Sequence, residues 1–338
     1  MELLLSGDWF GTKNIQRAKI KGFKSLDSFR EINKVELGFL LVPFSQSGES
    51  LGVKTKTYGF EKILLIEIEG FESYFQGIKQ IKLSEISKAE QKNHFVNSIL
   101  RAKELIKEGD IYQINLTTRF DFELVGDGKS LFLEFFKKQP VPFGFYLGFE
   151  EFEIISGSME LFLKREGFKL MSCPIKGTAK DAKKLLKSEK DRAENLMIVD
   201  VVRNDLARVS KSGSVKVEEI FKLKRFRTLY QMVSCVSSVS NLESYEILLK
   251  TFPPASVVGA PKKRALEIIN QLELYPRGFY CGCAGILKGN DFTLSVLIRT
   301  AHIFDEVVSY FAGAGIVYDS DPEREWEEVI LKTRAFRI

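Results

Sequence analysis

Apolar residues follow two different spacings along the chain, and each spacing predicts one kind of element. Short apolar runs bounded by glycine predict strands in the first part of the chain, at 35–44 and 62–68. Alternating or continuous apolar segments predict further strands at 111–122, 144–148, 152–156, 168–171, 214–240, 279–287, 292–304 and 307–317. The strands therefore extend over most of the chain.

A spacing near 3.6 residues predicts helices between these strands. Residues 85–109 carry Phe95, Ala102 and Ile106 at that spacing, and Gly109 stands where the helix would stop. Further helices are expected at 181–208, at 260–274 and from Asp321 and Pro322, a capping residue followed by a favourable first residue. Runs of strands interrupted by single helices indicate an α+β fold with sheets packed on each other.

Composition and charge describe an ordinary globular protein. The chain has 338 residues, 44% of them hydrophobic and 28% charged, and a net charge of +5 from 50 basic and 45 acidic residues. The two signs are interleaved without a basic block, so we expect no nucleic-acid partner and no membrane partner. The N-terminus does not resemble a signal peptide, and no uncharged apolar stretch approaches 18 residues. We therefore expect a cytoplasmic location.

Cysteine and histidine offer little support for nucleophilic or metal chemistry. The four cysteines lack metal-ligand spacing, and Cys281 and Cys283 are more simply alternate positions on a strand of a reduced protein than a redox pair. The two histidines, His94 and His302, stand in no recognisable catalytic setting. A Cys-His or Ser-His nucleophile is therefore not favoured.

Two pairs of acidic residues lie on predicted helices. Asp191 and Glu194 are three residues apart, as are Glu325 and Glu328, so each pair shares one helix face. If the two faces meet, four carboxylates surround one point, and such hard oxygen ligands suit Mg²⁺. Taken alone, each pair is more commonly solvated helix surface, and Glu328 could simply pair with Lys332.

A lysine and a glycine pair are the other candidates for chemistry. Lys176 follows proline at an apolar strand end, and a lysine desolvated in a pocket loses its charge and becomes nucleophilic. Gly313 and Gly315 flank Ala314 where backbone N–H groups could approach an anion closely. Taken alone, a surface lysine and a tight strand-end turn are the more common explanations.

The order of several motifs along residues 85–338 resembles the chorismate-binding enzyme family. That family includes anthranilate synthase component I, aminodeoxychorismate synthase component I, and the isochorismate and salicylate synthases. The resemblance rests on strings at 109–116, 174–178, 191–195, 202–205, 213–215, 252–262, 298–300, 313–316 and 321–323. It implies large antiparallel β-sheets packed as a sandwich with helices on the outside. Residues 85–338 would form the chorismate-binding catalytic domain, and 1–84 a shortened β-rich region packed on it.

The resemblance also implies a role for each residue at a matching position. Glu194 and Glu328 match ligands of Mg²⁺, the expected cofactor, and Asp191 and Glu325 match residues that orient those ligands. The residues matching substrate contacts are Tyr280 and Arg299 for one carboxylate, the Gly313 and Gly315 backbone for the other, Lys332 as a charge partner, and also Gln113, Thr178 and Ser256. A guanidinium suits a planar carboxylate because it can form two parallel hydrogen bonds with it.

Within the family, two positions, Gln113 and Lys176, favour the aminodeoxychorismate synthases, and Glu160 matches an acid found in the family. Gln113 stands where isochorismate and salicylate synthases carry a lysine base that activates water. Lys176 stands where anthranilate synthases usually have alanine, and in the aminodeoxychorismate subfamily its amine is understood to attack C2 of chorismate. Glu160 matches an acid that can protonate the leaving C4 hydroxyl. The expected product is 4-amino-4-deoxychorismate, the precursor of 4-aminobenzoate and folate.

The chain differs from the family pattern at one position and lacks a glutaminase motif. Gln231 stands where many relatives have histidine, so an acid–base role there is in doubt. Without a glutaminase motif, the ammonia is expected to come from a separate glutamine amidotransferase subunit. Two alternatives stay open: an anthranilate synthase component I with an unusual lysine, and a non-catalytic chorismate-binding or scaffold protein.

Overall fold

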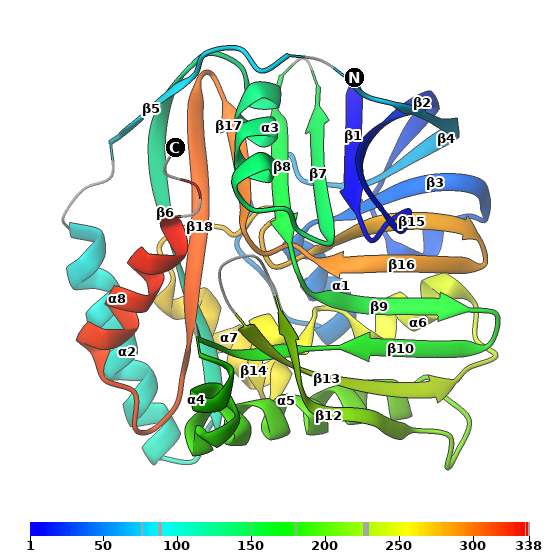
Figure 1. Ribbon diagram of the computed structural model, residues 1–338. Helices are drawn as coiled ribbons and strands as arrows, with labels where there is room; N and C mark the ends of the chain where they lie inside the picture. The colour runs from blue at the N-terminus through cyan, green and yellow to red at the C-terminus, as the bar shows by residue number, and fades with distance from the viewer. Residues whose placement is uncertain are drawn as a thin grey trace.

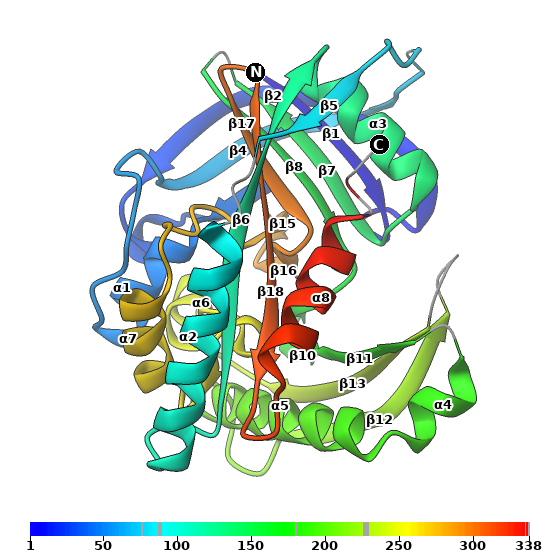
Figure 2. The same ribbon diagram turned by 90° about the vertical axis from the view of Figure 1, so that its left-hand side faces the viewer.

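The structure is a computed structural model that describes residues 1–75, 77–86, 90–149, 151–179, 181–225, 230–334 and 336. Its antiparallel strands join into one 18-stranded sheet that curls back on itself, with helices outside (Figures 1 and 2). The strands are β1 Glu2–Gly7, β2 Thr12–Leu26, β3 Val35–Val42, β4 Ile63–Ser73, β5 Lys82–Glu85, β6 Gln113–Val125, β7 Phe143–Gly148, β8 Glu153–Ser158, β9 Leu161–Glu166, β10 Lys169–Cys173, β11 Ile175–Ala179, β12 Lys216–Arg225, β13 Tyr230–Val239, β14 Gly259–Ala260, β15 Cys283–Gly289, β16 Asp291–Val296, β17 Thr300–Phe304 and β18 Val307–Ile316. The expected α+β fold of large antiparallel sheets is confirmed.

Helices cover the outer faces of this sheet. They are α1 Ser47–Leu51, α2 Glu90–Lys107, α3 Gly128–Lys138, α4 Ala182–Lys187, α5 Glu189–Ala207, α6 Ser244–Thr251, α7 Lys262–Leu272 and α8 Pro322–Thr333. Figure 2 shows α2 and α8 beside β6 and β18, and α5 below β13. Among the helices of the described ranges, none is both long and apolar enough to cross a bilayer.

The N-terminal strands belong to the same sheet as the rest of the chain. β1 pairs with β2 and also with β7, and β3 pairs with β4 and with β15. Leu4 packs into one hydrophobic cluster, while Leu3 and Leu5 pack into a second cluster on the other face. Since successive strand residues point to opposite faces, a run of three leucines marks a strand buried on both sides.

The aromatic rings of α2, β6 and α8 lock these three elements together. Phe95 lies with its ring centroid 5.7 Å from that of Trp326, and Phe120 on β6 lies 5.9 Å from the same indole. Aromatic contacts at these separations stabilise a pair beyond the area they bury. The acidic face of α8 is thereby fixed relative to β18 and its two glycines.

Two predicted elements are each divided in two. Residues 181–208, predicted as one helix, form α4 and α5, because Ser188 is extended and its hydroxyl caps α5 by accepting from Asp191 N. The predicted strand 292–304 is β16 and β17, because Arg299 between them has a left-handed backbone (φ 52°).

The predicted ends of several other elements were also wrong. The strand predicted at 279–287 begins only at Cys283, because Cys281 lies in a turn with φ 66°, so these cysteines do not alternate along one strand. Glu85 belongs to β5 rather than to the predicted helix 85–109, which is observed as α2. Residues 87–89 of that helix and 226–229 of the predicted strands 214–240 lie outside the described residues.

Candidate functional site

Lys176 lies on β11 at a point where the strand is irregular. Ile175 pairs with Val233 and Thr178 pairs with Gln231, so β11 has one more residue than β13 between these pairs. Gly177 completes the bulge with φ 82°, and a Cβ atom there would lie 2.9 Å from Cβ of Asp191 on α5. Glycine at 177, directly after Lys176, therefore lets the strand approach α5 closely.

The amine of Lys176 lies in a desolvated, charged environment. Burial lowers the pKa of Lys176, and the negative charges of Glu194 and Glu160 oppose this shift, as does Glu328. The positive charge of Lys332 lowers the pKa further. A lysine whose ammonium form is disfavoured has more of the neutral, nucleophilic amine near neutral pH.

Gln113 and Lys176 converge on the backbone of Gly315. A Cβ atom at Gly315 would lie 2.8 Å from Nε2 of Gln113 and 3.4 Å from Nζ of Lys176. The amide oxygen of Gln113 is buried and has no partner among the described residues. Any larger residue at 315 would fill the space where these two side chains meet, so the glycine keeps that space open.

Gly313 and Lys332 form the neighbouring part of the site. A Cβ atom at Gly313 would lie 2.5 Å from the carbonyl oxygen of Leu116, so a side chain there would force β18 away from β6. Lys332 donates from Nζ to the Gly313 carbonyl at 2.7 Å and to Oε1 of Glu328 at the same distance. Its charge is the main cause that lowers the pKa of Glu328.

Glu160 lies between β8 and β9 and is only 4% exposed. Burial raises its pKa to about 7, while the Ser256 hydroxyl, the charge of Lys176 and the Ile175 backbone act in the other direction. The Ser256 oxygen makes no hydrogen bond of regular geometry within the described ranges. A cavity of about 20 Å³, which can hold one water, is lined by Glu160 and Ser256 together with Pro174. Glu160 can thus remain protonated near neutral pH.

The two predicted acidic faces lie on neighbouring helices, α5 and α8. Lys190 joins them, with Nζ 3.9 Å from Oε1 of Glu194 and 3.6 Å from Oε1 of Glu325. Burial raises the pKa of Glu194, with Glu328 and Asp191 adding to the effect. Ser320 orients Glu325 by donating to its Oε1 at 2.8 Å.

The carboxylates of Glu194, Glu325 and Glu328 are of a kind that suits a hard divalent cation. Within the described residues, no three His, Cys, Asp or Glu side chains gather closely enough to hold a metal ion. The ammonium of Lys190 lies between the carboxylates of Glu194 on α5 and Glu325 on α8. Oxygen donors of this kind are those that Mg²⁺ prefers.

Arg299 and Tyr280 lie near Tyr310 and Phe311 on β18. The hydroxyl of Tyr310 donates to the Lys332 carbonyl at 3.2 Å, and the charge of Arg299 opposes the burial that raises the Tyr310 pKa to about 12. Tyr280 stacks on Phe311 with ring centroids 5.4 Å apart. These contacts place Arg299 and Tyr280 beside the strand that carries Gly313.

Thr178 is the expected substrate contact whose side chain is exposed to solvent. It lies opposite Gln231 across the β11–β13 pair. The amide oxygen of Gln231 is buried without a partner among the described residues.

The sequence-based reasoning missed a buried ion pair that supports the site. Arg277 donates to Oε1 of Glu273 at 2.7 Å and also to the carbonyls of Val257 and Asn115, each at 2.7 Å. Glu273 in turn accepts from the backbone of Thr117 at 2.8 Å. The pair therefore connects β6 to the turn that carries Ser256, and its i, i+4 spacing was the one local signal for it.

A second missed pair connects α5 to α7. Lys262 donates to Oδ2 of Asp205 at 2.8 Å and to the carbonyls of Thr251 and Pro253. Asp205 and Lys262 are far apart in the sequence, so no local pattern could have paired them.

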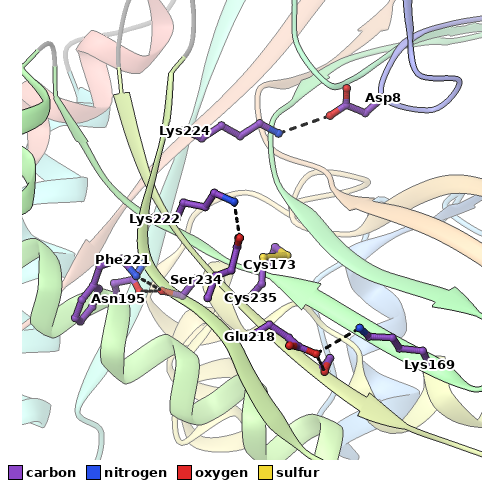
Figure 3. The surroundings of a disulfide bond; sticks show 12 residues. Asp8, Lys169, Cys173, Asn195, Glu218, Phe221, Lys222, Lys224, Ser234 and Cys235 are labelled. Atoms are coloured by element: carbon purple, nitrogen blue, oxygen red, sulfur yellow. Dashed lines mark hydrogen bonds and ion pairs between the residues drawn. A yellow bond between two sulfur atoms is a disulfide. The ribbon is translucent and has the colours of Figure 1, made fainter.

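A disulfide joins Cys173 and Cys235, which corrects the expectation of a fully reduced protein (Figure 3). The two residues face each other at the junction of β10 and β11 with β13, with Cα atoms 4.2 Å apart. The neighbouring Ser234 donates to Asn195 on α5, so Cys235 points to the opposite face of β13. The bridge thus fastens the chain three residues before Lys176.

A desolvated amine, a buried carboxyl that holds its proton, and two facing acidic helices are the kinds of groups that enzymes gather in an active site. Residues 71–337 match the family described as chorismate binding enzyme. The chain therefore belongs to the chorismate-binding enzyme family.

Individual relatives agree with this assignment. The chain is 37% identical over 258 residues to anthranilate synthase component 1 of Aquifex aeolicus, covering 72% of this chain and 52% of that protein. It is 39% identical over 246 residues to aminodeoxychorismate synthase component 1 of Escherichia coli, covering 69% and 54%. The chain thus spans about half the length of these relatives. The crystal structure of anthranilate synthase component I from Streptococcus pneumoniae shares the fold, with a TM-score of 0.79, 21% identity, and coverage of 100% of this chain and 90% of that one.

Proposed function

We propose that this chain is component I of an aminodeoxychorismate synthase, which aminates chorismate at C4. The observation that carries the proposal is the position of Lys176, whose Nζ reaches the open space beside Gly315 and shares its surroundings with Glu160. An amine with a lowered pKa is suited to attack, and a carboxyl with a raised pKa is suited to donate a proton.

In the proposed first step, the neutral amine of Lys176 forms a bond to C2 of chorismate. Both ring double bonds shift, from C1=C2 to C1=C6 and from C5=C6 to C4=C5. The C4–O bond breaks, and Glu160 gives its proton to the departing hydroxyl, which leaves as water. In the second step ammonia forms a bond to C4, both double bonds return to C5=C6 and C1=C2, the bond between C2 and Lys176 breaks, and the amine is regenerated. The incoming nitrogen loses one proton, which the Glu160 carboxylate can take back. The sum is chorismate and ammonia converted into 4-amino-4-deoxychorismate and water.

Binding of chorismate is proposed at the groups around this centre. Arg299 and Tyr280 would hold one carboxylate, and the backbone of Gly313 and Gly315, with Lys332 nearby, would hold the other. Gln113, Ser256 and Thr178 are the remaining proposed contacts. Glu194 and Glu328 would hold Mg²⁺, oriented by Asp191 and Glu325, and the ion would neutralise negative charge on the substrate.

The proposed nitrogen source is a separate glutamine amidotransferase subunit that delivers ammonia. The relatives called component 1 carry names that presuppose a further component. A second candidate function, anthranilate synthase component I, is supported by the similarity to the Aquifex aeolicus protein. Lys176 is the residue that favours the first candidate.

The test is incubation of the chain with chorismate, MgCl₂ and an ammonium salt, with and without an added aminodeoxychorismate lyase, followed by chromatographic identification of the products. We expect 4-aminobenzoate only when the lyase is present. Fluorescent anthranilate formed without the lyase would support the second candidate instead. Absence of turnover by folded protein in both reactions would contradict both candidates.

The role of Lys176 is tested by Lys176→Ala, with Lys183→Ala on the exposed surface of α4 as the matched control. We expect the first variant to lose at least 100-fold in rate, within the range typical for removal of a nucleophile, and the control to keep the wild-type rate. An unchanged rate for Lys176→Ala would remove the covalent step.

A further inference from the structure

Arg299 has an unusual partner for a half-buried arginine. Its Nη1 donates to the amide oxygen of Gln139 at 3.2 Å, and it forms no ion pair within the ranges that the structure describes. Arginine pairs most strongly with carboxylates, because two parallel hydrogen bonds then form between opposite charges. A neutral amide instead orients the guanidinium and leaves its positive charge uncompensated.

Gln139 is held in place by the end of α3. It is the residue directly after the helix, and its backbone N–H donates to the Phe135 carbonyl at 3.0 Å. Figure 1 shows α3 lying along β7 and β8, next to β17. The position of Gln139 is therefore set by a helix rather than by a loose loop.

The same helix packs against β8, the strand that is hydrogen-bonded to the backbone of Arg299. A Cβ atom at Gly157 on β8 would lie 2.1 Å from Cε1 of Phe135, so only glycine lets this ring pack there. The backbone N–H of Gly157 donates to the Arg299 carbonyl at 3.0 Å. Phe135, Gly157, Arg299 and Gln139 thus form a closed chain of contacts, which fixes both ends of the Gln139–Arg299 hydrogen bond.

The left-handed backbone of Arg299 belongs to this arrangement. Its φ of 52° interrupts the chain between β16 and β17, and Thr300 directly afterwards pairs with Ser156. A non-glycine residue rarely adopts this conformation unless its surroundings enforce it. The contacts with Gly157 and Gln139 are part of these surroundings.

The amide nitrogen of the Gln139 side chain has no hydrogen-bond partner among the described residues. This atom, Nε2, is buried. Since Arg299 can only donate, the amide oxygen must be the atom that faces it, and the amide nitrogen must face elsewhere. Buried donors are nearly always paired, so this nitrogen is suited to a site that an anion completes.

We propose that Gln139 is the positioning residue for Arg299: it orients the guanidinium toward the substrate carboxylate while leaving its charge unpaired. The inference rests on the proposed function, in which Arg299 binds that carboxylate. The alternative is a purely structural hydrogen bond that only secures the end of α3.

Two variants separate these roles because they change different properties. Gln139→Glu keeps an oxygen acceptor for Arg299 and adds a negative charge, whereas Gln139→Met removes the acceptor and adds no charge. If Gln139 preserves an unpaired charge, Gln139→Glu is the more harmful variant. If it serves only as a structural partner, Gln139→Met is the more harmful one.

The experiment measures steady-state amination with ammonium, binding of chorismate by calorimetry, and thermal unfolding. We expect Gln139→Glu to raise KM and Kd for chorismate at least tenfold and Gln139→Met to raise them about threefold, with kcat within twofold of wild type and unchanged Tm. Lys138→Met, which shortens an exposed side chain on the same helix end, is the control and should leave all values unchanged.

Several outcomes would overturn the inference. Equal KM values for the wild type and Gln139→Glu would do so, as would greater damage from Gln139→Met accompanied by a lower Tm. If the wild-type chain binds no chorismate at all, that result contradicts the proposed function. The inference about Gln139 then fails with it, because Arg299 would have no substrate carboxylate to bind. Binding and turnover by the wild type with unaffected variants would refute only the inference.

Discussion

Lys190 on α5 reaches Glu325 on α8, with its Nζ 3.6 Å from the carboxylate oxygen Oε1, and the same Nζ lies 3.9 Å from Oε1 of Glu194. One exposed ammonium therefore interacts with both acidic helices, at the place where we propose that Mg²⁺ binds. A bound lysine and a bound metal ion compete for the same negative charge.

Lys190→Ala is accordingly expected to strengthen Mg²⁺ binding. The lysine of these ion pairs is 60% exposed and so screened by solvent. Such pairs contribute about 1 kcal/mol, so the concentration of Mg²⁺ giving half-maximal amination should fall about two- to fivefold. The measurement is a Mg²⁺ titration of activity, supported by calorimetry without substrate. Lys187→Ala, on the neighbouring helix α4, is the control. Weaker Mg²⁺ binding in Lys190→Ala would mean that Lys190 supports the metal site rather than competing for it.

Glu160 predicts a dependence on pH. Burial raises its pKa to about 7, so the protonated form required of an acid is lost as the pH rises through that value. We expect kcat/KM to fall on the alkaline side of pH 7. Glu160→Gln should lose most of the activity and, in whatever remains, lack this alkaline decline. A wild-type profile that stays flat from pH 6 to 9 would exclude Glu160 as the acid.

The same group makes a prediction for stability. The unfolded chain titrates this carboxyl near about pH 4.3, so between that value and about 7 the folded protein binds the extra proton. The free energy of unfolding contributed by Glu160 therefore decreases as the pH rises through this interval. Urea unfolding at several pH values should show a smaller decrease for Glu160→Gln than for the wild type.

The Glu273–Arg277 pair predicts a large stability effect. Its two side chains are 5% and 2% exposed, so Glu273→Ala would leave the Arg277 guanidinium buried without its counter-charge. Breaking a buried pair in this way typically costs about 3–5 kcal/mol. Denaturant unfolding measures the loss. The control is Glu267→Ala, which breaks the exposed pair with Arg264 on α7 and should cost less than about 1 kcal/mol. Similar losses from both variants would contradict this account.

The disulfide predicts sensitivity to reducing agents. Cys173 and Cys235 are 62 residues apart, and chain entropy gives a crosslink of that span about 4 kcal/mol of stabilisation. Reduction by dithiothreitol should therefore lower the Tm of the wild type. The double variant Cys173→Ser, Cys235→Ser should have the lower Tm from the start and should not respond to the reductant. A response of the double variant would trace the effect to other thiols.

Much of the fold could be predicted from hydrophobic spacing, because most strands and helices have one uniform environment. The failures fall where one residue breaks an otherwise regular pattern. Ser188 divides a continuous helical pattern through its cap, and Arg299 divides a strand pattern through its backbone angle. Spacing carries no information about such single-residue events.

The residues of the candidate site could not be chosen from hydrophobic spacing either. Lys176 and Glu160 could be selected from the sequence only through a family resemblance, and the structure then supplied the burial that shifts their pKa values. Lys190 and Gln139 could not be selected at all. Their relevance lies in contacts with α8 and with Arg299, which depend on how distant segments pack.

Ten successive residue pairs join β18 to β6, from Val307 opposite Glu123 to Ile316 opposite Ile114. Because side chains alternate between faces, inserting or deleting one residue in β18 ahead of the glycines would turn Gly313 and Gly315 away and bring the neighbouring methyl group of Ala314 into their place. Changes in chain length are tolerable only in the flanking turns, such as the one at Asp305 and Glu306. In related proteins, insertions and deletions should therefore accumulate in those turns and be absent between them.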